Sequence, residues 1–181
     1  MKIIALGDSI TQGFPYGPRE SWVYYTAREL NLNIINKGIC GDLTWNMLKR
    51  FQLDVVASDP THVLILGGTN DAFLGCPLEE VSTNFTAMVE MACQHGITPV
   101  IGLPIPSLSE PEEVILMSYR EWLQDYAQSK RIKIIDFYAP FKAAIEAGTG
   151  MRLYVDEVHP SVWGYELMGK TAVESLRDLI S

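Results

Sequence analysis

A serine follows directly on an apolar run near the start of the chain, in the segment IALGDSITQG (residues 4–13). A serine hydroxyl is a weak nucleophile at neutral pH, so Ser9 can attack a substrate only if a base removes its proton. The alternative is structural, because small polar residues commonly end buried strands. Catalysis therefore requires that the chain also supply a base, a group that orients the base, and donors for a developing oxyanion.

Of the three histidines, His159 is the candidate base. It lies in VDEVHPS, three residues after Asp156, and a tight turn at this spacing can bring the carboxylate to the imidazole Nδ1. Glu157 is closer in sequence but is expected to point elsewhere. His62 and His95 are expected to be structural, because they lie before a strand and at the end of a helix.

Three glycine-rich turns carry other small polar side chains, and each follows an apolar run. They are GDSITQG (7–13), NKGICGD (36–42) and GGTND (67–71). The carboxyl ends of parallel strands meet at one edge of a sheet, where ligands bind in such folds, so we expect the three turns to lie side by side. Asp8 and Asp71 are interpreted as carboxylates that brace these loops.

Together with DEVHP (156–160), these turns resemble the four sequence blocks of the SGNH, or GDSL-type, hydrolase family. The blocks follow one another in order from near the first residue to near the last. The resemblance implies a triad in which Ser9 is the nucleophile, His159 the base and Asp156 the group that orients it. The order Ser, Asp, His is shared with α/β-hydrolases, but the Gly-x-Ser-x-Gly elbow of those enzymes is absent from the sequence around Ser9.

The same resemblance implies an oxyanion hole made by the backbone N–H groups of Ser9 and Gly41 and by the side-chain amide of Asn70. Gly38 also fits the second block. Gly41 is preferred because Asp42 follows it and can cap the helix expected to begin next. The structural alternative for Asn70 is that its amide only caps a turn.

Five short apolar, β-branched runs alternate with longer amphipathic segments. Each run is nearly apolar throughout, as expected of parallel strands covered on both faces. The runs are residues 2–7, 32–36, 62–68, 99–104 and 133–137. We therefore predict an α/β protein in which residues 1–181 form a single domain. Its expected architecture is a three-layer α/β/α sandwich around a five-stranded parallel sheet with flavodoxin-like topology.

Helix start and stop signals lie between these runs. Pro77 is expected in the first turn of one helix, and Gly96 at its end. Ser109 and Glu112 have the spacing of a capping box at the start of a second helix. A last helix is predicted from about residue 161 to residue 180.

Composition narrows the classes of partner. A net charge of −8 and a pI near 4.8 leave no basic stripe for a nucleic acid. The N-terminal apolar run is too short for a signal peptide, and no run approaches a membrane span, so the cytoplasm is the expected compartment. Three cysteines without a C-x-x-C pair indicate free thiols. No ligand cluster suggests a metal, and no cofactor is expected.

The expected function is that of a serine esterase or acylhydrolase that cleaves small, short-chain carboxylic esters through an acyl-enzyme on Ser9. Two alternatives use the same triad: acyl transfer to an alcohol other than water, and deacetylation of a carbohydrate. A cysteine hydrolase built on Cys40 is a further alternative. A non-catalytic flavodoxin-like module is disfavoured, since the chain lacks a G-x-G-x-x-G turn and a P-loop. A receiver domain would also need an aspartate where Gly67 and Gly68 stand.

Loops with aromatic and apolar side chains are expected to line the approach to the serine. They are residues 14–22, 72–77 and 103–111, together with Trp163. This composition suits an acyl chain, an aryl ester or the stacking face of a sugar.

Overall fold

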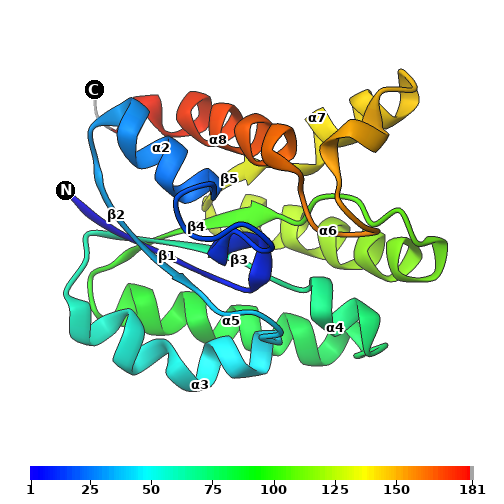
Figure 1. The fold of residues 1–181 in the computed structure, drawn as a ribbon. Coiled ribbons are helices and arrows are strands. Elements are labelled where there is room, and N and C mark those ends of the chain that lie inside the picture. Colours follow the sequence, from blue (N-terminus) through cyan, green and yellow to red (C-terminus); the bar gives the residue numbers. More distant parts are fainter. Residues whose placement is uncertain (180–181) are drawn as a thin grey trace.

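The computed structural model describes residues 1–179. Five parallel strands form one sheet in the order β2-β1-β3-β4-β5 (Figure 1). Their bounds are β1 Lys2–Gly7, β2 Asn33–Gly38, β3 His62–Leu66, β4 Thr98–Leu103 and β5 Lys133–Asp136. The predicted fold class is confirmed, because this strand order is the flavodoxin-like one and helices cover both faces. Each predicted strand end lies within two residues of the observed one.

Helices α3, α5 and α6 cover one face of the sheet, and α2, α7 and α8 cover the other (Figure 1). The longer helices are α2 Trp22–Leu30, α3 Thr44–Asp54, α5 Leu78–Gln94, α6 Glu110–Lys130, α7 Tyr138–Glu146 and α8 Val162–Leu176. Two short helices, α1 Ser9–Gln12 and α4 Thr69–Phe73, follow β1 and β3 directly. Short 3-10 turns occupy Val56–Ser58, Gly150–Leu153 and Arg177–Leu179. Within residues 1–179, no helix has both the length and the apolar character needed to cross a bilayer.

The central strand β1 shows why its sequence is apolar without alternation. Ile4 and Leu6 pack into the core beneath α3 and α5, whereas Ile3 and Ala5 pack into the core beneath α2 and α8. All four are fully buried. Burying a side chain such as isoleucine contributes about 1.5–3 kcal/mol, so both faces of the strand stabilise its place in the sheet.

Three details of the helix predictions are corrected. The capping box at Ser109 does not form, because the Ser109 hydroxyl bonds the Glu112 carboxylate and caps no backbone N–H. Pro77 is the N-cap of α5, one residue before its first turn. The last helix ends at Leu176 and continues as a 3-10 turn, while Ile180 lies outside the described residues.

The sheet register brings the predicted turns to one edge. Gly7, at the end of β1, pairs with Gly38 at the end of β2 and with Leu66 at the end of β3. The segments that follow these three residues are those in which the sequence indicated chemistry. At Gly38 a β-carbon would lie 2.1 Å from the Gln12 backbone nitrogen, so glycine is needed for β2 to approach α1.

Replacing Gly38 by alanine is expected to destabilise the protein by about 1–3 kcal/mol or more, because backbone atoms of α1 must move to admit the methyl group. Urea unfolding measures the loss. Gly96→Ala is the matched control: Gly96 has a φ of +71° but no atom within 4 Å of the added carbon, so only backbone strain of about 1 kcal/mol is expected. A Gly38 variant no less stable than the Gly96 variant would contradict this account.

Candidate active site

Ser9 is the first residue of α1, immediately after β1. The side chain of Asp8 caps this helix, since its Oδ1 accepts the Ile10 N–H at 2.9 Å. Gly13 ends the helix after one turn with a φ of +102°. An N–H in the first turn of a helix has no intrahelical acceptor, and no other described residue accepts the Ser9 N–H. The serine therefore presents both its hydroxyl and a free backbone donor at the edge of the sheet.

The structure brings Ser9, His159 and Asp156 together. The Ser9 Oγ lies 3.0 Å from His159 Nε2, and His159 Nδ1 lies 2.7 Å from Asp156 Oδ2. The other oxygen of Asp156 accepts the N–H groups of Val158 and His159, at 2.9 and 2.7 Å. As expected, the Glu157 side chain takes no part in this chain of hydrogen bonds. The arrangement is that of a nucleophile, a base and the carboxylate that orients the base.

The surroundings of Asp156 favour its charged form. Partial burial alone would raise the pKa of this carboxyl, but the hydrogen bonds from the Val158 and His159 N–H groups and from the imidazole outweigh that effect. The net result is a pKa below the usual value. Asp156 is therefore a carboxylate at neutral pH and can stabilise an imidazolium beside it.

An aromatic ring from the segment 14–22, which was expected to line the approach to the serine, lies against the imidazole. The Phe14 ring centroid is 4.6 Å from that of His159, with the planes tilted by 56°. The Phe14 carbonyl accepts the Tyr165 hydroxyl at 2.7 Å, which ties the segment after α1 to α8. The His159 ring is thus held by the Asp156 carboxylate at one nitrogen and by the Phe14 ring against its face.

The loop after β2 leaves one N–H group open. The Gly38 N–H donates to Asn36 Oδ1 at 2.9 Å and is therefore occupied. In the stretch 38–44, the Gly41 N–H alone has no acceptor among the described residues. Gly41 has a φ of +79°, a conformation that favours glycine. Hydrogen bonding thus favours Gly41 over Gly38 as a donor to a ligand.

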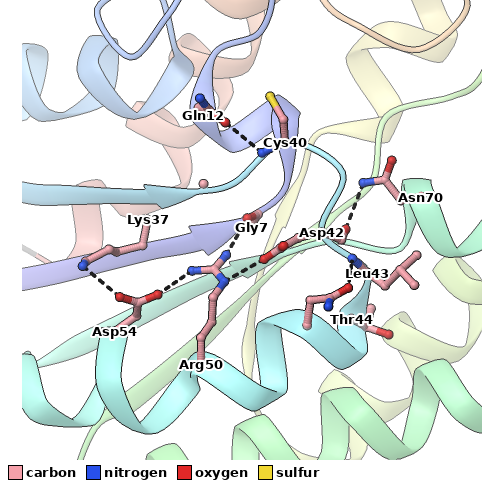
Figure 2. Close-up of polar contacts among 12 residues, drawn as sticks. Gly7, Gln12, Lys37, Cys40, Asp42, Leu43, Thr44, Arg50, Asp54 and Asn70 are labelled. Atoms are coloured by element: carbon pink, nitrogen blue, oxygen red, sulfur yellow. Dashed lines mark hydrogen bonds and ion pairs between the residues drawn. The ribbon is translucent and has the colours of Figure 1, made fainter.

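The amide of Asn70 is fixed by the same loop. Asn70 lies in α4, and its Nδ2 donates to the Asp42 carbonyl at 2.9 Å (Figure 2). An amide NH2 has two hydrogens, so one remains for a ligand in the cavity that Asn70 lines. The expectation that Asp42 caps the following helix is wrong: Leu43 is the N-cap of α3, and the Asp42 carboxylate pairs with Arg50 at 2.7 Å.

Asp71 braces the start of α3, as its place in the turn suggested. Its carboxylate accepts the Thr44 N–H at 3.0 Å and the Thr44 hydroxyl at 2.6 Å. Asn84, from α5, donates in turn to the Thr44 hydroxyl at 3.0 Å. These bonds join α3, α4 and α5 behind the loop that carries Gly41.

A cavity of about 390 Å³ opens at the serine. Its walls are Ser9, Thr69, Asn70, Phe73, Asp156, Glu157, Val158 and His159. Of the loops expected to line it, only 72–77 contributes a wall residue, Phe73. The loop 103–111 instead supports the base from behind, because the Leu108 N–H donates to the Glu157 carbonyl at 2.8 Å. Trp163 is 64% exposed and is not among the wall residues.

The remaining candidates lie apart from this chemistry. His62 begins β3 and His95 follows α5, both at the opposite edge of the sheet. Partial burial, followed by the charge of Asp8, raises the pKa of the Cys40 thiol, which is the reverse of what an activated thiolate requires. Over residues 1–179, no three His, Cys, Asp or Glu side chains are grouped so that they could hold a metal ion.

Residues 5–167 match the GDSL-like lipase/acylhydrolase family. Among solved structures, a member of the lipolytic protein G-D-S-L family from Veillonella parvula superposes with a TM-score of 0.88 at 32% identity. That superposition covers 96% of this chain and 97% of the other.

Two curated proteins are similar over shorter stretches. The arylesterase of Vibrio mimicus is 27% identical over 68% of this chain and 77% of its own length. The uncharacterised lipoprotein YqeF of Bacillus subtilis is 35% identical over 58% of this chain. The match spans 48% of the length of that lipoprotein.

Asp8, beside the serine, is a fully buried carboxyl group with one unpartnered oxygen. Its Oδ2 has no hydrogen-bond partner among the described residues. Burial, and to a smaller degree the charges of Asp71 and Asp42, raise the pKa of Asp8 to about 7, although the Ile10 N–H opposes the shift. The group therefore keeps its proton in the folded protein at pH values where an unfolded chain has lost it.

This shift predicts that Asp8 lowers stability as pH rises. Between about pH 4 and about pH 7 the unfolded chain binds fewer protons than the folded one, so the free energy of unfolding falls with pH. In Asp8→Asn, which keeps the oxygen that accepts the Ile10 N–H, this dependence is removed. The free energy of unfolding of the variant, relative to that of the wild type, should rise by on the order of 2–4 kcal/mol across this interval. Above about pH 7 the difference should stay constant. Urea unfolding of both proteins over the pH range measures it, and a constant difference would contradict the assignment.

Proposed function

Because the chain belongs to the GDSL-like lipase/acylhydrolase family, we propose that it hydrolyses carboxylic esters through an acyl-enzyme on Ser9. The observation that carries the proposal is the continuous chain of hydrogen bonds from Ser9 Oγ through the His159 ring to Asp156, at 3.0 and 2.7 Å. A serine and a base at this separation can exchange a proton without further movement. The proposed substrate is a small-molecule ester.

Acylation begins when Ser9 Oγ attacks the ester carbonyl carbon and its proton passes to His159 Nε2. The carbonyl π electrons move to oxygen and form an oxyanion. Asp156 stabilises the imidazolium that results. When the tetrahedral intermediate collapses, the bond to the leaving alcohol breaks and the alcohol takes the proton from His159, leaving the acyl group on Ser9.

Deacylation repeats these steps with water. His159 removes a proton from water as its oxygen attacks the acyl carbon, and a second oxyanion forms. The bond to Ser9 Oγ then breaks, and the serine recovers its proton from His159. The carboxylic acid leaves, and the site returns to its starting state.

The three donors proposed for the oxyanion are the N–H groups of Ser9 and Gly41 and the second amide hydrogen of Asn70. The first two have no acceptor among the described residues, and the Asn70 amide is oriented by the Asp42 carbonyl. Donors fixed before the reaction stabilise charge that exists only in the transition state. In related enzymes, removing one such donor raises the activation free energy of the reaction by about 3–4 kcal/mol.

The cavity supports a preference for short acyl groups. Its volume of about 390 Å³ is at the small end of ligand sites, and Phe73 and Val158 form its apolar walls. Acetyl to about hexanoyl groups are the proposed range. We also propose that the enzyme acts in the cytoplasm, since free thiols such as Cys40, Cys76 and Cys93 favour a reducing compartment.

An organophosphonate probe is expected to label Ser9 and to abolish hydrolysis of p-nitrophenyl acetate. Ser9→Ala should lose both labelling and turnover while keeping its melting temperature within a few degrees. Mass spectrometry of the intact protein and of its peptides locates the label. Ser129→Ala, at an exposed serine in α6, is the matched control and should label fully. The Cys40→Ser variant should also be labelled at Ser9. If it is not labelled, the result would favour the Cys40 thiol as the nucleophile.

Turnover of p-nitrophenyl esters is expected to be greatest for acyl groups of no more than about six carbons. Phe73→Ala should move the optimum to longer chains, because it removes an apolar wall of the cavity. Leu74→Ala, at a neighbour that is 71% exposed and lines no part of the cavity, should leave the optimum unchanged. An optimum near about sixteen carbons in the wild type would contradict the proposed range. Acetylated sugars and thioesters in the same series test the other leaving groups.

A further inference from the structure

Arg50, on the second turn of α3, donates hydrogen bonds to three separate acceptors. Its Nε donates to Asp42 Oδ2 at 2.7 Å, its Nη1 to Asp54 Oδ2 at 2.9 Å, and its Nη2 to the Gly7 carbonyl at 2.9 Å (Figure 2). The pair with Asp54 lies within α3. The other two bonds leave the helix and reach β1 and the loop after β2.

Gly7 and Asp42, the two partners of Arg50 outside α3, are close in sequence to residues of the proposed reaction. Gly7 is two residues before Ser9, and its carbonyl also accepts the Ile39 N–H at 3.0 Å. Asp42 follows Gly41, and its backbone carbonyl is the acceptor that orients the Asn70 amide at 2.9 Å. One guanidinium thus connects the strand that carries the nucleophile to the loop that carries or orients the two other donors.

From this geometry we infer that Arg50 is a positioning residue for the oxyanion hole. By bonding Gly7 and Asp42 at once, it sets the separation between Ser9 and the Gly41 and Asn70 donors. This inference rests on the function proposed above. Arg50 itself is not among the residues that line the cavity at Ser9, so its effect must be exerted through the loop.

The contacts of Asp42 make the loop depend on this one cation. Within residues 1–179, Arg50 is the only residue that donates to the Asp42 carboxylate. The two side chains are only 14% and 13% exposed, so water replaces the bond poorly. By contrast Asp54 has a second cation, Lys37, at 2.9 Å (Figure 2). Loss of Arg50 would therefore leave Asp54 paired and release Asp42.

The three acceptors also explain why an arginine occupies this position. They lie in three directions around the Arg50 guanidinium, and this planar group offers a separate N–H to each. A lysine ammonium is a single point on a flexible stem and cannot occupy all three places. Arg50→Lys should accordingly restore only part of what Arg50→Met loses.

The test compares steady-state kinetics of Arg50→Met, Arg50→Lys and wild type on p-nitrophenyl acetate, with active sites counted by organophosphonate titration. A donor that is displaced weakens transition-state binding and leaves ground-state binding unchanged, so Arg50→Met should lower kcat about tenfold to a hundredfold with KM within about threefold. Arg50→Lys should lie between the two. Lys37→Met is the matched control, because it removes a cation of the same cluster that touches neither Gly7 nor Asp42, and its kcat should match wild type.

A double-mutant cycle separates positioning from general destabilisation. If Arg50 acts through the donors, the loss caused by Arg50→Met should be at least about threefold smaller in an Asn70→Ala background. Asp42→Ala removes the acceptor of the Arg50 Nε–H but keeps the backbone carbonyl, so it should reproduce the kcat loss, and it serves the same purpose if Arg50→Met does not fold.

The outcomes are distinct. An unchanged kcat per active site in both Arg50→Met and Asp42→Ala, or an equal loss in the two backgrounds of the cycle, would overturn the positioning role. Such a result would leave the proposed function intact provided that Ser9→Ala is inactive. Full activity in Ser9→Ala would instead overturn the proposed function, and the inference with it.

Discussion

The site depends on one hydrogen bond between groups 150 positions apart in the chain, the 3.0 Å contact of Ser9 Oγ with His159 Nε2. Closing so long a loop costs entropy that the packing of the folded core must offset, and an error of about an ångström would separate the Ser9 hydroxyl from the His159 ring. Ser9 is held because it follows strand β1, which is buried from Ile3 onward. His159 is held because it precedes α8, which packs on the same sheet and reaches back through Tyr165 to Phe14.

The two sides of the serine are stabilised by different forces. On the side of the base, the segment around His159 closes on itself: the Val155 N–H donates to the His159 carbonyl, and Tyr154 bridges to Pro160. The Leu108 N–H then docks this segment onto the loop before α6. These are backbone bonds that do not depend on side-chain identity. On the oxyanion side, the loop after β2 is held by the charged side chains of Asp42 and Arg50.

Burying carboxyl groups close to the serine lowers the stability of the folded protein, and other interactions must offset this loss. Asp71 is compensated by two bonds from Thr44, although burial still raises its pKa. Asp8 has less compensation, because one of its oxygens is buried without a partner among the described residues. Its other oxygen caps the short helix that begins with Ser9, so the group that costs stability also fixes the helix that carries this serine. Departures from full hydrogen bonding are common at functional sites for this reason.

Sequence patterns were sufficient where the physical signal is local. Strands covered on both faces are apolar throughout, so their order and approximate ends could be predicted. The spacing of Asp156 and His159 within one turn predicted their contact, and both lie where expected relative to Ser9.

The tertiary structure decided what depends on distant partners. The Asn70 amide is oriented by the Asp42 carbonyl, 28 positions away in the chain, which local spacing did not reveal. The predicted cap at Asp42 was wrong because Arg50, two helical turns away, provides a stronger partner for its carboxylate. The hydrogen-bond partner of a polar group is set by whichever donor or acceptor the fold brings within about 3 Å, and this information is spread over the whole chain.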